Sequence, residues 1–466
     1  MKTIIKKPKL NLSTVLLPII FFSVSAFVFF IYSIDLSCLI LALFLFIYAK
    51  FFRKIEKLPS YVDLLLLTSI AVVIPLLTTV IFEKSGYFIP AIGFIMLVTL
   101  LFDNLELSLL FSIFISYLSA SVNGGNFNIG ISLFSASLCV TILSYRLRRR
   151  AQIIKAGVIA GFVQFFIAFI VENYQSDFTL YSLNFKLFES CLINGFISSI
   201  VVIGILPIFE FTFKVVTNIS LLELSDFNHT LLRRMILEAP GTYQHSLVVA
   251  NLAEAASESI GANPLLARVG AYYHDIGKIP KANYFVENQI RYRDVHKDLK
   301  PSISKLIIIN HVKEGVELAK KHRLNPRIID FVEQHHGKSL VYYFYHRAKE
   351  LEPDKEKELD KEYRYPGPRP QSKEVAMVSL ADNIEAFSRT LEDPTPSRIE
   401  EMVRSVVRKK FIEGELDESN LTLRDLGKII QSFVRILNAV FHTRINYPKD
   451  ENSNKKPSKN KENKPI

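Results

Sequence analysis

The sequence predicts an all-α fold in two parts, a polytopic bundle of transmembrane helices followed by an all-helical domain outside the membrane. The mean hydropathy is +0.24 over 466 residues, which argues against a wholly soluble protein. Charge is partitioned, because residues 1–213 hold only 15 of the 56 Lys and Arg residues and 10 of the 45 Asp and Glu residues. All ten histidines lie at or after His229. Neither part shows a long alternating pattern of the kind that predicts strands.

The first part contains eight apolar runs that are long enough, or nearly so, to cross a bilayer. They lie at about 12–32, 35–51, 61–82, 87–102, 104–121, 126–145, 153–171 and 187–213. Lysines precede the first run, but this run is too long for the core of a cleavable signal peptide and has no small-residue cleavage pattern after it. We therefore predict a transmembrane domain of about eight spans over residues 1–213, with the first run retained as an anchor.

The Lys and Arg residues between these runs predict the orientation of the spans. They gather before the first run (Lys2, Lys6, Lys7, Lys9), between the second and third (Lys50, Arg53, Lys54, Lys57) and between the sixth and seventh (Arg146, Arg148, Arg149, Arg150, Lys155). Eight spans with both the N-terminus and the second part in the cytoplasm satisfy this pattern. The sequence therefore predicts a multi-pass protein of the cell membrane, with the lipid bilayer as a partner.

The composition also disfavours several functions. The net charge of +11 does not indicate a nucleic-acid polymer as partner, because the basic clusters lie where membrane anchors are expected. Cys38, Cys139 and Cys191 all lie inside apolar runs and have neither zinc-ligand spacing nor the pattern of a secreted disulfide framework. A transporter usually has charged residues deep within its spans. Asp63 and Glu210 lie near predicted span ends, so the sequence shows no intramembrane charge pair of this kind.

The second part has the pattern of helices with charged faces. Thr242 is predicted to cap a helix that is closed by Gly261, and Asn263 with Pro264 to open the next helix. Further helices are predicted at about 302–322, 326–335, 371–390, 396–411 and 422–444.

The remaining stretches set the predicted domain boundaries. Residues 214–447 are predicted to form one cytoplasmic domain that starts with a linker helix at 214–240. The charged and then proline-rich stretch 350–370 is expected to be a loop. Residues 448–466 consist mainly of Lys, Asn, Pro and Glu, so a disordered basic tail is predicted there.

Histidine and aspartate residues in the second part form an ordered set that could bind metal. Its members are His245, His274, Asp275, His311, His335, His336 and Asp382. A single helical histidine is more often a packed or surface residue, but ligands on several helices can converge if the helices bundle. Imidazole and carboxylate ligands suit divalent transition metals such as Mn, Fe, Co or Zn. One aspartate can bridge two such metals, and a two-metal site can activate a water for in-line phosphoryl displacement.

The strings around these residues resemble those of the HD phosphohydrolase superfamily. They are Pro-Gly-Thr-Tyr-Gln-His-Ser from Pro240, Gly-Ala-Tyr-Tyr-His-Asp-Ile-Gly-Lys from Gly270, Ile-Asn-His-Val-Lys-Glu-Gly from Ile309, Gln-His-His-Gly from Gln334 and Tyr-Pro-Gly-Pro at 365–368. With the multi-span region, they resemble the 7TM-HD membrane phosphodiesterases of cyclic-di-AMP over roughly residues 35–447. The sequence departs from that family around Ser33, where about two or three residues stand in place of a sizeable extracellular domain.

The resemblance implies an all-helical HD domain with a dinuclear centre of two divalent transition metal ions, Mn or Fe. One metal would be held by His245, His274 and Asp382, and the other by His311, His335 and His336, with Asp275 bridging both. Adjacent helical residues point about 100° apart, so His335 and His336 can share a metal only near a helix end or bend. Gly337 tolerates such a break.

The resemblance further implies hydrolysis of cyclic-di-AMP to linear pApA, with His274 and Asp275 as catalytic residues. Lys278, one helical turn beyond His274, is the third predicted catalytic residue, and a solvated lysine at a helix end is the alternative interpretation. The predicted substrate-binding residues are Lys278, Tyr363, Arg364, Tyr365 and Arg369. In this interpretation the lysine neutralises a phosphate, the arginines close over the nucleotide, and one of the tyrosines stacks on a base.

Two other functions stay open at this point. The HD domain could act on cyclic-di-GMP, a nucleoside triphosphate or (p)ppGpp, although Gly337-Lys338-Ser339-Leu340 follows the paired histidines where the cyclic-di-GMP subgroup has Gly-Tyr-Pro. Alternatively, the chain could be a membrane receptor whose HD domain only binds a nucleotide. The predicted partners are cyclic-di-AMP and the lipid bilayer, and the membrane helices could also pair two copies into a homodimer.

Overall fold

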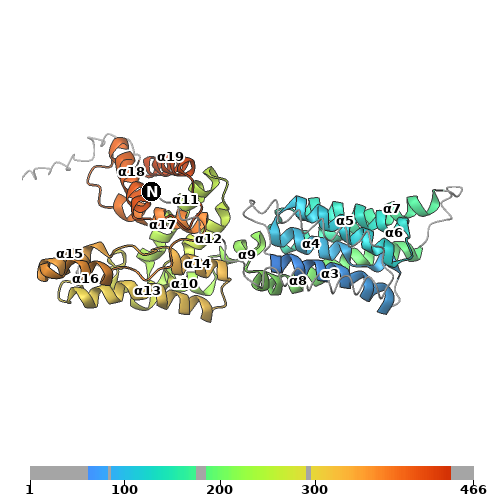
Figure 1. Ribbon diagram of the computed structural model, residues 1–466, viewed down its shortest axis with the longest axis horizontal. Coiled ribbons are helices and arrows are strands. Elements are labelled where there is room, and N and C mark those ends of the chain that lie inside the picture. Colours follow the sequence, from blue (N-terminus) through green and yellow to red (C-terminus); the bar gives the residue numbers. More distant parts are fainter. Residues whose placement is uncertain (1–60, 82–84, 175–184, 290–294, 442–466) are drawn as a thin grey trace, which may run out of the picture.

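The computed structural model describes residues 61–81, 85–174, 185–289 and 295–441. Within these ranges the chain is almost wholly helical, with one isolated antiparallel bridge between Leu340 and Arg364. Figure 1 shows apolar helices at one end of the molecule and the remaining helices at the other, with α9 (Asn218–Leu224) between them. The predicted all-α fold class is confirmed.

The apolar end consists of α3 (Tyr61–Leu76) with its continuation η1 (Leu77–Ile81), η2 (Gly86–Phe88), α4 (Ala91–Phe102), α5 (Leu105–Val122), α6 (Phe127–Ser144), α7 (Arg150–Asn173) and α8 (Phe185–Phe213). Among the described residues, α5 to α8 are long and apolar enough to cross a membrane. These elements correspond to six of the eight predicted runs. The runs at 12–32 and 35–51 and the tail at 448–466 lie outside the described residues.

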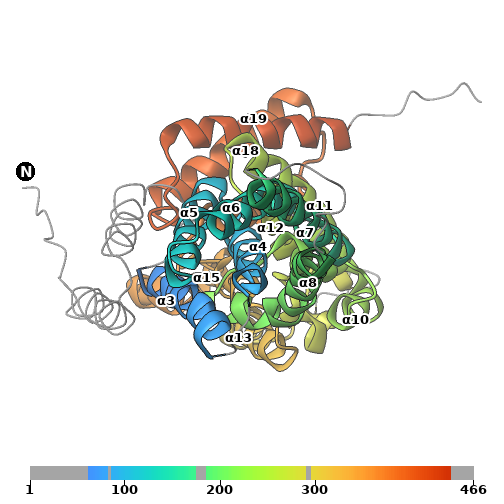
Figure 2. The same ribbon diagram turned by 90° about the vertical axis from the view of Figure 1, so that its right-hand side faces the viewer.

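The short helix α4 is the centre of this bundle. All twelve of its residues are buried, and Figure 2 shows it surrounded by α5, α6, α7 and α8. The backbone that enters α4 is a single short 3₁₀ turn and two non-helical residues, so its carbonyls need other partners at membrane depth. Asn194 donates to the carbonyls of Tyr87 (3.1 Å) and Ile89 (3.0 Å), and Gln164 donates to Tyr87 O (2.9 Å). Side chains of α7 and α8 therefore stabilise this entry.

The prediction of one linker helix over 214–240 is wrong, because the structure has two separate helices there. Instead, α9 ends at Leu224 and α10 (Thr230–Glu238) begins six residues later, because Asp226 Oδ1 accepts a hydrogen bond from the backbone N–H of Asn228 (2.9 Å) and forms a turn. The buried carboxylate of Glu210, at the end of α8, accepts from Thr217 N and Ser220 Oγ, both at 2.8 Å. The last membrane helix therefore holds the first turn of α9.

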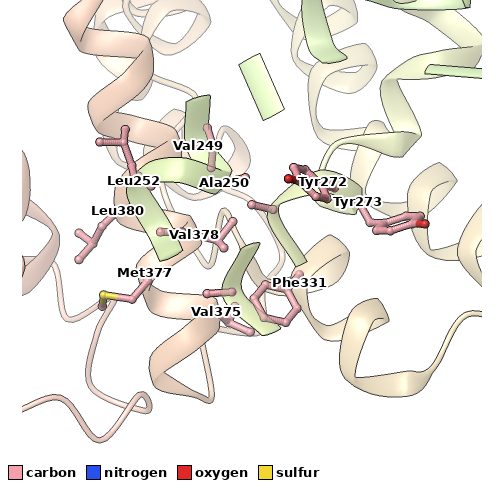
Figure 3. Close-up of a cluster of buried hydrophobic side chains, with 14 of the residues drawn as sticks. Val249, Ala250, Leu252, Tyr272, Tyr273, Phe331, Val375, Met377, Val378 and Leu380 are labelled. Atoms are coloured by element: carbon pink, nitrogen blue, oxygen red, sulfur yellow. The ribbon is translucent and has the colours of Figure 1, made fainter. Parts of the chain in front are cut away.

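The second part packs its helices around one large apolar core. They are α10, α11 (Pro240–Ser259), α12 (Pro264–Tyr273), η4 (Ile276–Tyr284), η5 (Val286–Asn288), α13 (Pro301–Lys321), α14 (Pro326–Gln334), α15 (Tyr342–Leu351), η7 (Pro353–Lys355), α16 (Glu356–Glu362), α17 (Lys373–Ser388), α18 (Pro396–Ile412) and α19 (Leu423–Val440). Figure 3 shows Val249, Tyr273, Phe331 and Val378 meeting in this core from α11, α12, α14 and α17. Six of the seven predicted metal ligands lie on these four helices or directly after their ends.

Two local predictions are corrected by the structure. Helix α11 begins at Pro240 and is not capped by Thr242, because the side chain of Asn288 accepts from Gly241 N (2.8 Å) and Thr242 N (3.1 Å). The stretch 350–370 is not entirely a loop, since it contains η7 and α16. Leu359 is buried in a small apolar cluster with Tyr345 and Tyr363, and this one anchor holds an otherwise charged helix in place.

Candidate metal centre

The predicted ligands come together from five elements. His245 lies on α11, His274 and Asp275 follow the end of α12, His311 lies on α13, and the paired histidines 335 and 336 follow the end of α14. Two groups of ligand atoms each fall within 4.8 Å of one another, namely His245, His274 and Asp275, and Asp275, His311, His335 and His336. Asp275 belongs to both groups.

The two oxygens of Asp275 face different histidines. Oδ2 lies 3.2 Å from His274 Nε2 and 3.7 Å from His245 Nε2. Oδ1 lies 3.4 Å from His311 Nε2 and 3.6 Å from His335 Nε2. With a side chain only 1% exposed, the carboxylate is positioned as a bridge between two sites.

Asp382 on α17 stands opposite this bridge. Its Oδ1 lies 3.1 Å from His245 Nε2, and its Oδ2 lies 3.5 Å from His336 Nδ1. Asp382 therefore faces one histidine of each group, although its oxygens lie too far from the other ligand atoms to belong to either group.

The hydrogen bonding of the buried rings fits the binding of cations. Nδ1 of His311 faces Ile308 O at 2.5 Å, and Nδ1 of His335 faces Phe331 O at 3.0 Å. Because a carbonyl oxygen can only accept a hydrogen bond, we assign the proton to Nδ1 in both rings. Their Nε2 atoms are then two acceptors 3.4 Å apart, and both face Asp275 Oδ1. Converging acceptor lone pairs repel one another, and a divalent cation would satisfy them.

The other group shows the same deficit. Nδ1 of His274 faces Ala271 O at 2.7 Å, so its Nε2 is an acceptor that lies against Asp275 Oδ2. His274 Nε2 and Asp275 Oδ1 are both buried without a hydrogen-bond partner among the described residues. Unsatisfied buried polar atoms are costly, and a metal ligand role explains them. The residues therefore fit a metal centre of the kind found in HD domains.

The break after α14 allows two adjacent histidines to share one side of the centre. The helix ends at Gln334, and Gly337 adopts a positive φ of 57°. The rings of His335 and His336 lie with centroids 4.0 Å apart instead of diverging as they would on a continuous helix. An added Cβ at Gly337 would lie 2.0 Å from the carboxylate of Glu415, which accepts from Lys338 N (2.8 Å). The glycine is therefore needed for both conformation and space.

Charge is unevenly distributed across the centre. Burial alone raises the pKa of Asp275, but His274 and Lys278 outweigh it and hold that pKa well below its usual range. Burial lowers the pKa of His245, yet hydrogen bonds with Asp382 and Glu385 raise it to about 10. Burial and neighbouring histidines lower the pKa values of His335 and His336. These two rings are therefore neutral at physiological pH, whereas His245 carries a proton that a bound metal would displace.

Lys278 lies beside the bridging aspartate. Its Nζ is 2.7 Å from Asp275 Oδ2 and 2.9 Å from Glu287 Oε1. Burial lowers the pKa of Lys278, but the two carboxylates outweigh this and raise it, so the ammonium stays charged. Glu287 also accepts from the hydroxyl of Thr242 (3.1 Å), which ties η5 to the start of α11.

Of the other predicted substrate-binding residues, Tyr365 contacts a predicted metal ligand, whereas Tyr363 and Arg364 contact residues outside the metal centre. Tyr365 stacks on His336, with centroids 4.2 Å apart and planes at 27°. Tyr363 is only 2% exposed and packs in the cluster around Tyr345, so it offers no ring face to a base, contrary to that prediction. Arg364 is engaged by Asp360 through hydrogen bonds of 3.0 and 2.9 Å.

Arg369 lies farther along the same loop. Its guanidinium approaches Glu415 (3.9 Å) and Asp417 (3.6 Å) and therefore faces acidic side chains in this arrangement.

Sequence reasoning missed one residue in direct contact with the set. Glu385 lies one helical turn after Asp382, and its Oε2 is 2.6 Å from His245 Nδ1. An acidic residue three positions after a predicted ligand on a helix is the signal that could have identified it, because such residues share a face.

The helical fold and this centre together define a multi-pass membrane protein with an HD domain. Residues 27–217 match the protein family described as "7TM receptor with intracellular HD hydrolase", and residues 242–386 match the HD domain. The chain belongs to this family of membrane-bound HD-domain proteins, as the sequence resemblance implied. The family description counts seven membrane helices, and our count of about eight stays a prediction.

Two curated relatives agree with this assignment. "Cyclic-di-AMP phosphodiesterase PgpH" of Bacillus subtilis (strain 168) is 37% identical over 406 residues, which is 86% of this chain and 56% of the relative. The protein of the same name from Listeria monocytogenes serotype 1/2a (strain 10403S) is 37% identical over 352 residues, or 75% of this chain and 48% of the relative. A crystal structure of the L. monocytogenes PgpH HD domain in complex with cyclic-di-AMP matches with 42% identity and a TM-score of 0.45, covering 47% of this chain and 100% of that one. The chain spans about half the length of the curated relatives it matches.

Proposed function

We propose that this protein is a membrane-anchored, metal-dependent phosphodiesterase that hydrolyses cyclic-di-AMP to linear pApA. The observation that carries the proposal is the convergence of two sets of buried acceptor atoms on the two oxygens of Asp275, which fits a pair of cations. Support for the substrate comes from the two relatives named as cyclic-di-AMP phosphodiesterases at 37% identity.

The proposed ligands are the seven predicted ones: His245, His274, Asp275, His311, His335, His336 and Asp382. We propose Mn or Fe, because the carboxylates of this mixed set suit Mn and its imidazoles suit Fe. Two such ions, when bound, supply a nucleophilic water at neutral pH and neutralise charge on a phosphodiester. The chain's own contribution is to fix the spacing of the two positions through one buried carboxylate.

The proposed substrate side is where the centre keeps contact with solvent. The side chains of His274 and His335 are fully buried, whereas those of His336, Asp382 and Lys278 are 19%, 11% and 13% exposed. A phosphate that enters from this side would meet the ammonium of Lys278. The ring of Tyr365 lies against His336 and is 8% exposed.

Tyr365 provides a direct test of base stacking next to His336. We expect Tyr365→Ala to raise KM for cyclic-di-AMP about 5- to 160-fold, because stacking of a base on an aromatic ring contributes about 1–3 kcal/mol. Tyr365→Phe keeps the ring and should leave KM within about twofold. Steady-state kinetics of the two variants measures this, and an equal loss in both would assign the effect to the hydroxyl and not to stacking.

The domain boundaries belong to the same proposal. We propose that residues 1–213 form the membrane domain, with the N-terminus inside, and that residues 214–447 form the cytoplasmic HD domain. A homodimer and a disordered tail at 448–466 stay predictions. Labelling of single cysteines introduced at Lys6 and Lys84 from either side of sealed vesicles would test the orientation.

The proposed activity is tested with the purified full chain in detergent. After removal of metal with a chelator, Mn(II) or anaerobic Fe(II) is returned, and cyclic-di-AMP, cyclic-di-GMP and a mixed cyclic dinucleotide are compared by chromatography. We expect no activity in the metal-free protein and preferential conversion of cyclic-di-AMP to pApA after metal return. Preferential cleavage of cyclic-di-GMP would overturn the substrate assignment. Binding without cleavage of any of the three would favour a receptor.

A further inference from the structure

His245 differs from three other histidines of the centre in the partner of its second nitrogen. Nδ1 of His274, His311 and His335 faces backbone carbonyls of the preceding helical turn, namely Ala271 O, Ile308 O, and Phe331 O together with Val332 O. Nδ1 of His245 instead lies 2.6 Å from the carboxylate of Glu385. A carboxylate behind a metal-binding imidazole orients the ring and raises its basicity, so His245 would be the stronger ligand.

Glu385 is held firmly in this position. Its side chain is 5% exposed, and its second oxygen, Oε1, accepts from Arg389 Nε at 2.6 Å. Asp382 lies one turn earlier on α17 and approaches Nε2 of His245 at 3.1 Å. One helix therefore presents a carboxylate to each nitrogen of the same ring.

The charges around the two halves of the centre are unequal. Three carboxylates lie beside His245 and His274: that of Asp275 through one oxygen, that of Asp382 and that of Glu385. Two cations lie near them, Lys278, which is also paired with Glu287, and Arg389. Beside His311, His335 and His336 lies the other oxygen of Asp275, with Asp382 Oδ2 at 3.5 Å from His336. The first half thus has more carboxylates beside it, although Lys278 and Arg389 offset part of their charge.

We propose that the half built on His245 and His274 takes up its divalent cation first and more tightly, and that Glu385 sets this order as a positioning residue behind His245. The inference rests on the metal centre of the proposed function. It does not depend on the identity of the nucleotide, since it concerns the affinities of two cation positions. Loss of such an outer partner typically weakens metal binding about 10- to 100-fold.

The test is a titration of the metal-free full chain with Mn(II), followed by electron paramagnetic resonance and by competition with a chelator of known affinity. In the unaltered protein we expect an isolated Mn(II) signal up to one equivalent, which gives way to a spin-coupled pair as the second ion binds. Glu385→Gln should weaken the first step about 10- to 100-fold and should bring the pair signal to lower occupancy. His311→Ala should lose the second step and keep the first.

Two further variants make the outcome decisive. Glu374→Gln alters another carboxylate of α17, which accepts a hydrogen bond from Asn263 N at 2.8 Å and not from a predicted metal ligand. This control variant should leave both metal-binding steps unchanged. Glu385→Asp keeps the charge but is too short to reach His245, and it serves if Glu385→Gln does not fold. Unchanged affinity for the first ion in the folded Glu385 variants, or loss of that step in His311→Ala, would overturn the proposal. The titration contains no nucleotide, so it tests metal uptake separately from hydrolysis. A protein that takes up metal in this order but does not hydrolyse cyclic-di-AMP in the activity assay would reject the proposed function and keep this inference.

Discussion

Asp275→Asn is expected to reduce hydrolysis by about 10³-fold or more and to prevent assembly of a metal pair. One carboxylate presents an oxygen to each group of histidines, at 3.2 Å from His274 and at 3.4 Å from His311. The amide that replaces it is neutral, and it turns an NH₂ group toward one of the two positions. Metal-supplied charge stabilisation is worth several kcal/mol, and each 1.36 kcal/mol corresponds to a factor of ten in rate. Metal content by mass spectrometry and turnover of cyclic-di-AMP measure the two effects.

A control separates this effect from a general loss of stability. Asp330→Asn changes an aspartate on α14, the helix that leads to His335, but Asp330 is about one third exposed and pairs only loosely with Arg327. This variant should keep full activity. The double replacement of His274 and Asp275 by Ala should also abolish hydrolysis while membrane insertion stays intact. Near-normal turnover in either active-site variant would exclude the proposed metal mechanism.

The helices and the ligand set could largely be predicted from the sequence because their signals are local. Asn263 followed by Pro264 marks a helix start, and the structure shows Asn263 accepting from Leu266 N at 3.1 Å. The break at Gly337 follows from the same type of reasoning, since two adjacent ligands need a helix end. The ligands themselves were identified from strings that resemble those of a known family.

The partners of these residues could not be predicted, because they depend on packing between distant segments. Asn288 caps a helix that begins 48 residues earlier in the chain, at Pro240. Tyr363 and Tyr365 are two positions apart and similar in sequence terms, and both enter the same apolar cluster, yet only Tyr365 also stacks on His336. Spacing along the chain does not reveal which ring turns toward the site.

The close approach of η4 to α13 leads to the second large expected effect. A Cβ added at Gly277 would lie 1.8 Å from the carbonyl oxygen of His311 and 2.5 Å from Gly315 N. Both neighbours are backbone atoms, so one segment would have to move by roughly 1 Å, and such overpacking typically costs about 1–3 kcal/mol of stability. Gly277 follows Asp275 by two residues, so the same movement would separate Asp275 from His311. A misplacement of about 1 Å can lower turnover about 10²-fold.

Gly277→Ala is therefore expected to lose the second metal ion and about 10²-fold in turnover, along with part of its stability. Gly427→Ala is the matched control, because this glycine is exposed on α19 and an added Cβ there meets no atom within 4 Å. That change should raise the free energy of unfolding by about 0.5–1 kcal/mol, as alanine favours a helix. Thermal unfolding and metal analysis of the two variants compare them directly. If Gly277→Ala bound two metal ions as tightly as the unaltered chain, contact between η4 and α13 would not set the distance from Asp275 to His311.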